Sequence, residues 1–316
     1  MKTSLPCYMF FLCAIVLFAG SGYAQGCSDS GFCTMGAMKP DQIYIPKVKF
    51  RINSVELTQH IGHTRFGDWI HSSFLDINVG ITPKMNVQVR LPAYTTITGN
   101  MPTTQGWGDT YLNVNRTMVI HDKYQINLSL GGKLYNPAGS EKKSSEGQSM
   151  STYQQTGYGS NDLVTSMSLI SRKWLLAIGY RKPLNRMRDE FNHEQWRESP
   201  LYQTALVYPS SNRLLPGQDI ILRVERNFRF SQWSFYAGIL NIYRVTKDSE
   251  IDNSGHVVDI KGTDGLASNF IAGARYRLTI HSSIKLLASV RLRERDVNPD
   301  GLSRDFVGQL AYEIRF

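Results

Sequence analysis

Hydrophobic and polar residues alternate with a period of two along most of the chain after Lys47. Because successive side chains of a strand point to opposite faces, each alternating segment has one apolar and one mainly polar face. The alternation is plain at Val87, Val89 and Leu91, and at Ile126, Leu128 and Leu130. It predicts twelve strands, near residues 47–61, 69–81, 85–95, 108–120, 124–136, 161–171, 174–183, 217–229, 232–245, 266–279, 284–294 and 305–316.

The links between these strands alternate in length. Brief links such as "TPK", "HDK", "RK", "FS" and "IHSS" take turns with longer polar ones, and only the first link fits either group. A soluble sandwich has no reason to sort its loops in this way, whereas outer-membrane barrels have short periplasmic turns and long external loops. The fold class predicted is therefore all-β, an antiparallel transmembrane β-barrel of about 12 strands.

Residues 1–24 carry one charge, Lys2, followed by an apolar run and small residues up to Ala24. This is typical of a signal peptide cleaved near Ala24, because the apolar run is shorter than the ~20 residues of a membrane helix. Residues 25–46 are predicted to be an N-terminal periplasmic segment, and residues 47–316 the barrel. After export, Cys27 and Cys33 are candidates for a disulfide, with a redox or metal pair as the alternative; a lipoprotein signal at Cys27 is a further alternative.

The last strand alternates up to an aromatic terminal residue, with apolar side chains at every second position. This ending resembles the C-terminal signal that the barrel-assembly machinery recognises in bacterial outer-membrane proteins, and an aromatic ring there suits the membrane interface. It predicts the bacterial outer membrane as the location, with membrane lipid and the assembly machinery as partners. The candidate signal residues are Phe316, Ile314, Tyr312 and Leu310.

Two short motifs add a resemblance to known families. "GWGDTYLNV" resembles a strand opening of the phenol-degradation meta-pathway transporters, distant relatives of the fatty-acid channels, although Trp107 replaces their usual aliphatic residue. "GCSDSGFCTMGAMKP" resembles the N-terminal segment of uncharacterised outer-membrane proteins of Bacteroidetes. The resemblance implies a Gram-negative outer-membrane transporter but transfers no functional residue.

The chain is basic, with a formal net charge of +9. If the apolar parity faces lipid, a mainly basic set of side chains faces the lumen, which would favour anions. The alternatives are that loops neutralise these charges, or that they lie at the rim, or that Leu175, Ala177, Gly179, Leu287 and Val307 of the same parity pack the lumen. Nucleic acid is discounted as a partner, because the charges follow strand parity. The lumen candidates are Arg90, Lys133, Arg181, Arg223, Glu225, Arg275, Arg277, Arg291, Arg293, Glu313 and Arg315.

The segment "HIGHTRFGDWIH" offers weak candidates for metal ligands. A pairing centred on it would set His60 opposite His71 and His63 opposite Asp68, although histidines at a rim are more often solvated. The sequence lacks the Gly-x-Ser-x-Gly motif of a nucleophile elbow. We therefore expect no metal, no cofactor and no enzyme. The function predicted is a channel or transporter for a small solute, with a non-conducting surface barrel and a barrel hydrolase as alternatives.

Overall fold

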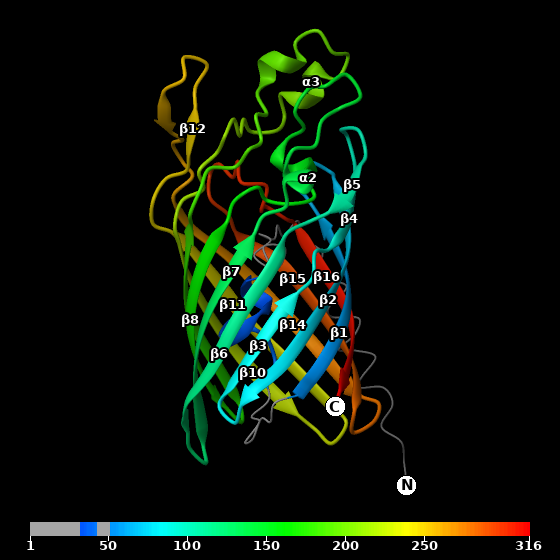
Figure 1. Cartoon of the computed structure of the whole chain (residues 1–316), viewed down its shortest axis with the longest axis vertical. Coiled ribbons are helices and arrows are strands. Elements are labelled where there is room, and N and C mark those ends of the chain that lie inside the picture. The colour runs from blue at the N-terminus through cyan, green and yellow to red at the C-terminus, as the bar shows by residue number, and fades with distance from the viewer. Residues whose placement is uncertain (1–31, 43–50) are drawn as a thin grey trace.

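The alternating segments form antiparallel strands that close into a barrel (Figure 1). The computed structural model describes residues 32–42 and 51–316. Strand β1 pairs with both β2 and β16, which closes the sheet. The barrel strands are β1 (Arg51–His63), β2 (Trp69–Thr82), β3 (Met85–Arg90), β4 (Tyr94–Thr98), β6 (Thr110–Ile120), β7 (Tyr124–Leu134), β8 (Asp162–Ser171), β9 (Trp174–Pro183), β10 (Asp219–Arg229), β11 (Trp233–Arg244), β14 (Gly265–Arg277), β15 (Ser282–Arg293) and β16 (Phe306–Arg315).

The barrel has twelve strand positions, as the alternation predicted. β3 and β4 share one position, because both pair with β2 and only residues 91–93 separate them. β4 then continues into a hairpin with β5 (Thr104–Trp107), which the sequence did not predict. Closure leaves no strand edge of the barrel with unpaired backbone groups, which a bilayer requires of any spanning sheet.

The links sort by length onto the two ends of the barrel (Figure 1). Residues 83–84, 121–123, 172–173, 230–232 and 278–281 form tight links at one end, which we call the short-turn end. Residues 91–109, 135–161, 184–218, 245–264 and 294–305 form the longer links at the other, which we call the loop end. The first link, residues 64–68, also lies at the loop end, which settles the side that the sequence left open.

The outer face of the barrel is apolar and carries aromatic side chains near both ends. In β9 the exposed and buried residues alternate without a break, with Leu176 and Ile178 exposed and Leu175 and Ala177 buried. Such an apolar band between aromatic girdles is typical of barrels that span a membrane. The girdle residues are Trp69, Tyr94, Trp107, Tyr180, Tyr243 and Phe306 at the loop end, and Tyr124, Trp174, Phe228, Phe230, Trp233, Phe235 and Phe316 at the short-turn end.

In residues 32–42 and 51–316, helical structure is confined to short turns. α2 (Pro137–Ser140), η3 (Thr152–Gln154), η4 (His193–Trp196) and α3 (Tyr202–Ala205) lie in the long links, together with the hairpin of β12 (Ser249–Ile251) and β13 (Val257–Asp259). Two further turns, η1 (Phe32–Thr34) and η2 (Gly36–Met38), precede the barrel in the chain. Within the described ranges, no helix has the length and apolar character needed to cross a bilayer.

Candidate functional site

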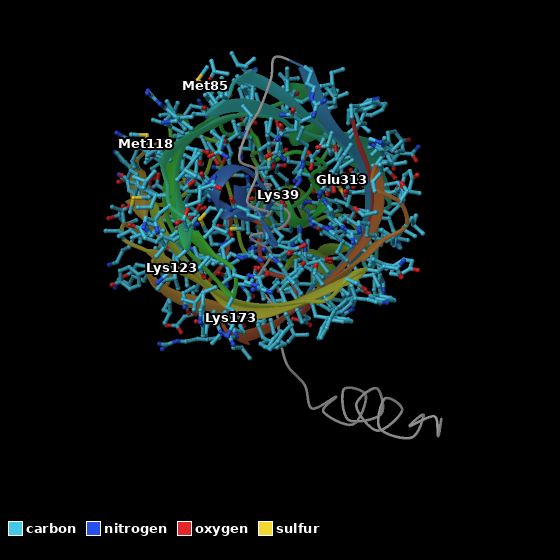
Figure 2. All side chains as sticks on the ribbon, turned by 90° about the horizontal axis from the view of Figure 1, so that it is seen from below. Lys39, Met85, Met118, Lys123, Lys173 and Glu313 are labelled. Atoms are coloured by element: carbon cyan, nitrogen blue, oxygen red, sulfur yellow. The ribbon has the colours of Figure 1, made fainter. Side chains whose placement is uncertain are left out.

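Residues 32–42 lie inside the lumen, where they appear dark blue in Figure 1. We call them the plug segment. Figure 2 looks into the barrel from the short-turn end and shows Lys39 near its centre, surrounded by the wall. The sequence predicted a periplasmic segment over residues 25–46, and the structure packs residues 32–42 of it against the inner wall of the barrel. Residues 25–31 and 43–46 lie outside the described residues.

Apolar side chains fix the middle of the plug segment against the wall. Cys33 and Met38 are each 1% exposed and belong to a cluster with inward-facing residues of seven strands. Cys33 is disulfide-bonded, and its predicted partner Cys27 lies outside the described residues. The lumen is thus partly packed. One of the alternatives in the sequence analysis was that inward-facing apolar residues such as Leu175 and Leu287 fill it. The cluster comprises Cys33, Met38, Ile170, Leu175, Ala177, Ile221, Tyr236, Leu240, Ile271, Leu287 and Val307.

Side chains of the wall bind the backbone of the plug segment. The amide of Gly36 donates to Gln88 Oε1 at 3.1 Å, and the amide of Ala37 donates to Ser129 Oγ at 3.1 Å. Arg223 Nη1 donates to the carbonyl oxygens of Cys33 and Met38, at 2.9 and 3.2 Å. A three-residue 3₁₀ turn cannot satisfy its own terminal groups, so buried ones need such partners.

At Gly36 the backbone of the plug segment lies close to Asn113 of β6. Its φ of 52° lies in the left-handed region, and a Cβ there would be 2.5 Å from Asn113 Oδ1. Any larger residue would therefore combine backbone strain with a clash. The turn can lie this close to the wall only because residue 36 is glycine.

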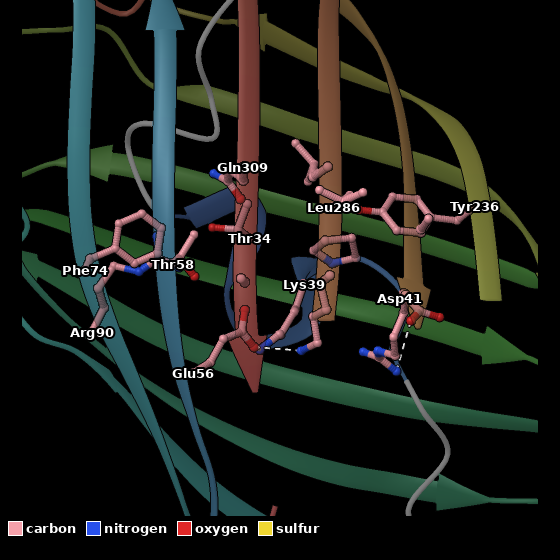
Figure 3. Close-up of a pocket in the computed structure, with 16 residues that line it drawn as sticks. Thr34, Lys39, Asp41, Glu56, Thr58, Phe74, Arg90, Tyr236, Leu286 and Gln309 are labelled. Carbon is pink, nitrogen blue, oxygen red and sulfur yellow. Dashed lines mark hydrogen bonds and ion pairs between the residues drawn. The ribbon is translucent and has the colours of Figure 1, made fainter. Parts of the chain in front are cut away.

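A cluster of four charges joins the plug segment to β1, β15 and β16. Glu56 Oε2 accepts from Lys39 Nζ at 3.0 Å and from Lys285 Nζ at 2.7 Å (Figure 3). Lys285 Nζ also lies 3.0 Å from Glu313 Oε1, whose carboxylate binds Arg315. Two lysines therefore share two carboxylates inside the barrel, so removing either acid would leave a partly buried cation without full compensation.

Asp41, the second-last described residue of the plug segment, lies at an arginine-lined cavity. Its Oδ2 lies 3.0 Å from Arg275 Nη1 and accepts from Ser234 Oγ at 3.2 Å, and its Oδ1 lies 3.8 Å from Arg229 Nη2. The backbone amide of Asp41 donates to Glu225 Oε1 at 3.1 Å. The side chain is only 4% exposed, so the contacts enclose it.

Two adjoining cavities at the short-turn end form what we call the vestibule. One has a volume of ≈170 Å³ and is lined by Arg229, Arg275, Arg277 and Arg315, which we call the arginine wall. The other has a volume of ≈150 Å³, and the two cavities share Asp41, Arg275 and Arg315. The second is lined by a group of carboxamides that we call the amide wall: Gln42, Asn53, Asn78, Asn86, Gln88, Asn115, Gln125 and Asn127.

A chain of buried ion pairs runs across the strands at the loop end. Lys133 Nζ lies 3.1 Å from Asp162 Oδ2, and Arg244 Nε lies 2.8 Å from Asp219 Oδ1. Arg181 bridges these two pairs, because it contacts both Asp162 and Asp219. Lys133, Arg181 and Arg244 each contact two or more carboxylates, so the charges largely cancel. The members are Asp109, Lys133, Asp162, Arg181, Asp219, Arg244, Asp248, Asp300 and Arg295.

Asp109 connects this chain of ion pairs to the long links. Its carboxylate accepts from the amides of Asn136 at 3.0 Å and Tyr158 at 2.8 Å. The preceding Gly108 leaves no room for a side chain, because a Cβ would be 2.6 Å from the carbonyl oxygen of Thr156. The Gly-Asp pair of "GWGDTYLNV" therefore has a structural role in this chain, anchoring residues 135–161.

The long links pack together into a cap with a hydrophobic core of its own. Trp196 Nε1 donates to the carbonyl oxygen of Ser149 at 3.1 Å, and Tyr208 Oη donates to Asp68 Oδ1 at 2.8 Å. These contacts join the first link to residues 135–161 and 184–218. The core, which we call the loop cap, comprises Met101, Met150, Tyr153, Phe191, Trp196, Ala205 and Tyr208.

One carboxyl group in the link of residues 184–218 is buried. Asp189 is 3% exposed, accepts from Ser211 Oγ at 2.6 Å and accepts from the amide of Phe191 at 3.1 Å. Burial raises the pKa of Asp189 to about 7, and the nearby charge of Glu190 adds to this effect while the hydrogen bonds oppose it.

Most of the predicted lumen residues are buried, and most have acidic partners. Arg90 binds Asp76 with two hydrogen bonds of 2.7 Å, and Arg223 binds Glu225. Arg291 binds both Glu294 and Asp305. The remaining cations pair as described above, except for two exposed ones: Arg277 lines the vestibule at the short-turn end, and Arg293 lies at the loop end of β15.

Sequence reasoning missed the acidic partners and the plug segment itself. Glu56 and Lys285 share the inward parity of the predicted strands, so that parity could have found them. Asp41 and Lys39 belong to a segment without alternation, where no strand pattern indicates a position in the lumen. Asp248 and Asp300 lie in links, and only the folded structure brings them to Arg244.

The pairing that suggested metal ligands is wrong by one residue. His60 pairs with Ser72, and His63 pairs with Trp69. A shift of one residue moves side chains to the opposite face, so His71 points outward while His60 is buried. Among residues 32–42 and 51–316, no group of three or more His, Cys, Asp or Glu side chains is placed to hold a metal ion.

The candidate assembly-signal residues lie on the outer face of β16. Leu310, Tyr312, Ile314 and Phe316 are all exposed, and the amide of Phe316 donates to the carbonyl oxygen of Asn53 at 3.1 Å. Phe316 thus belongs to the aromatic girdle at the short-turn end. Its role in assembly stays a prediction.

No family model and no curated protein matches the chain. Among solved structures it is similar to the NanC porin, with a TM-score of 0.46, 11% identity, and coverage of 84% of this chain and 100% of that chain. It is similar to the CymD monoaromatic hydrocarbon channel, with a TM-score of 0.43, 9% identity and coverage of 94% of both chains. It is also similar to outer membrane phospholipase A from Escherichia coli, with a TM-score of 0.38, 7% identity, and coverage of 85% and 94%. At such values we draw no functional conclusion from these neighbours.

Proposed function

We propose that the protein is an outer-membrane channel for small hydrophilic solutes, leaning toward anions, whose lumen is closed by the plug segment and the loop cap. The observation that carries the proposal is a closed barrel with an apolar outer face and a charged, hydrogen-bonding interior. Charged side chains that faced the lipid would destabilise the barrel, whereas a lumen that water enters can hold them. We infer that the short-turn end faces the periplasm.

The anion preference follows from where the charges remain uncompensated. Along most of the lumen each cation has a carboxylate partner, so little net field is left there. In the cavity at the short-turn end, Arg315 pairs with Glu313 and Asp41 is shared by Arg275 and Arg229, while Arg277 has no carboxylate at ion-pair distance among the described residues. Arginines concentrated at a pore mouth raise the local concentration of anions.

The plug segment has contacts that suit a movable element. Several of its hydrogen bonds go to side chains of the wall rather than into a strand ladder, so they can exchange for water one at a time. Its described apolar contribution is limited to Cys33, Met35, Ala37 and Met38, which are all buried. Displacing such a segment is much less costly than opening the strand ladder of the barrel.

A second candidate, a non-conducting barrel, is favoured by how fully the described residues fill the lumen. The cavities near the middle are small, ≈40 Å³ beside Glu56 and ≈60 Å³ beside Tyr111. A barrel of this kind would present the loop cap as a binding surface without passing a solute.

Permeation with a fixed plug segment separates the two candidates. Ala37→Cys combined with Ser129→Cys should form a disulfide that ties the plug segment to β7, since the amide of Ala37 already contacts Ser129 Oγ. Proteoliposomes containing the wild type should swell in a small sugar, and the cross-linked variant should not. The matched controls are the two single-cysteine variants, which should swell like the wild type. A wild type that never permits swelling would favour the non-conducting barrel.

A further inference from the structure

The vestibule combines two kinds of recognition chemistry on opposite sides of Asp41. The arginine wall comes from β10, β14 and β16, and the amide wall comes mainly from β1, β2, β3, β6 and β7. We propose that the vestibule binds a small organic anion that carries several hydroxyl groups, and that Asp41 occupies its anion position as a tethered competitor. This deepens the proposed channel function and rests on it for the route by which the solute arrives.

The anion position is defined by a carboxylate that already occupies it. Asp41 lies with one oxygen 3.0 Å from Arg275 Nη1 and 3.2 Å from Ser234 Oγ, while its other oxygen faces Arg229 at 3.8 Å. A carboxylate on a free solute presents the same two oxygens to the same groups. The structure therefore shows that this group of side chains accommodates a carboxylate.

More positive charge is present than Asp41 neutralises. Arg277 also lines this cavity and donates to the carbonyl oxygen of Ser231, a neutral partner. Within the described part of the chain, no carboxylate lies at ion-pair distance from Arg277. An incoming anion would thus meet a site that still carries net positive charge, which favours its binding.

Asp41 is held in a conformation that favours its release. Its φ of 45° lies in the left-handed region, which is unfavourable for residues other than glycine and is tolerated best by asparagine and aspartate. A solute that replaces the carboxylate allows the backbone at Asp41 to relax. Exchange of one carboxylate for another keeps the arginines paired throughout, so the displacement does not expose an uncompensated charge.

The amide wall suits hydroxyl groups. A carboxamide has both a donor and an acceptor, as a hydroxyl does, and it adds no charge. Gln125 is 5% exposed, yet its Oε1 has no hydrogen-bond partner among the described residues, and neither has Asn115 Oδ1. These acceptors are available to a solute with hydroxyl donors, while a purely apolar anion would leave them unpaired.

The cavity volumes limit the size of the solute. The two parts measure ≈170 and ≈150 Å³, whereas drug-sized ligands occupy pockets of roughly 300–1,000 Å³. A short chain or a single ring with one carboxylate and several hydroxyls fits this description. Its carboxylate would lie at Arg275 and its hydroxyls along the amide wall.

Binding in the vestibule would also loosen the plug segment. Asp41 and Lys39 attach its end to the wall, and the solute would replace the attachment made by Asp41. The remaining attachment through Lys39 and Glu56 is unaffected. The solute thus weakens one of the two charged attachments, at Asp41 and at Lys39, that the described part of the plug segment makes near the short-turn end.

Three probes of matched size separate the parts of this proposal. Calorimetric titration of the folded protein in detergent at low salt should show binding of gluconate, weaker binding of hexanoate, and no binding of sorbitol. Hexanoate lacks the hydroxyls and sorbitol lacks the carboxylate. Sorbitol binding as tightly as gluconate would overturn the anion position, and hexanoate binding as tightly would overturn the role of the amide wall.

Variants test the competitor directly. Asp41→Asn should raise the affinity for gluconate about tenfold, the worth of one charge-assisted hydrogen bond, because the tethered carboxylate is gone. Arg275→Gln should lower that affinity by about tenfold or more. If Arg275→Gln does not fold, Arg277→Gln at the same wall should lower the affinity in the same direction. Unchanged affinity in Asp41→Asn would show that Asp41 does not occupy the site.

A control and an independent readout complete the test. Arg226→Gln alters an arginine on β10 that stacks over Trp174 on the outer face, so gluconate affinity should stay unchanged. The titration does not depend on conductance. Gluconate binding by a barrel that never conducts would overturn the channel and keep the site, and conductance without gluconate binding would do the reverse.

Discussion

Glu56 connects two lysines that reach it from different parts of the fold. Lys39 belongs to the plug segment and Lys285 to β15, and both contact the same carboxylate oxygen within 3.0 Å. All three side chains lie inside the barrel, where water screens them poorly. Glu56 therefore stabilises both the barrel wall and the attachment of the plug segment to it.

Glu56→Gln should lower the free energy of unfolding by about 1.5–3 kcal/mol, because it removes the charge from hydrogen bonds to two partly buried ammonium groups. Urea unfolding of the detergent-solubilised barrel measures the change. The matched control is Glu194→Gln, which breaks an exposed pair with Arg197 in a loop. Exposed pairs contribute little, so that variant should stay within about 1 kcal/mol of the wild type. Equal effects of the two variants would contradict the role assigned to Glu56.

At the residue scale, sequence parity placed cations inward but could not pair them. Arg90 and Arg223 have the inward parity that the alternation indicated, and the structure buries both. Their acids were not predicted, because a partner on a neighbouring strand depends on register. The prediction for His60 and His71 shows the consequence, since an error of one residue put them on the same face.

At the scale of elements, the strands could be predicted and the plug segment could not. A strand with one buried face has apolar and polar residues in alternation, so a short stretch of sequence is enough to predict it. The plug segment has no such period, and wall side chains far along the chain, such as Gln88 and Arg223, satisfy its backbone. The β4–β5 hairpin was also missed, because it rises beyond the barrel where no alternation is required.

The link of residues 184–218 should loosen as the pH rises. Burial raises the pKa of Asp189 from its ordinary 3.8 to about 7, so the folded link binds a proton in this range that the unfolded link does not. The stabilisation is therefore fully present below about pH 4 and is lost as the pH approaches 7.

Limited proteolysis at several pH values measures this loosening. Asp189→Asn is the matched control, because its side chain is neutral at every pH and keeps an acceptor for Ser211. The cleavage rate of the wild type in residues 184–218, divided by that of Asp189→Asn, should rise between about pH 4 and 7. A ratio that stays constant would mean that Asp189 does not control the link.

At the scale of the whole molecule, closure and loop sorting together give the barrel an orientation. Protease added to intact cells should cut the exposed sites around Lys143 or Arg197 in the long links, since we infer that the loop end faces outward. Cleavage at Lys84 or Lys123 in the tight links instead would invert the orientation. Peptide mass spectrometry of the fragments distinguishes the two results.

The central claim is that solutes pass through this barrel, and single-channel recording in a planar bilayer tests it most directly. The wild type should give discrete current steps, with a reversal potential in a salt gradient that favours the anion. The variant cross-linked through Ala37→Cys and Ser129→Cys should be silent. A wild type that inserts as a folded barrel and remains silent would contradict the channel, and hydrolysis of the surrounding lipid by that silent protein would instead support a barrel hydrolase.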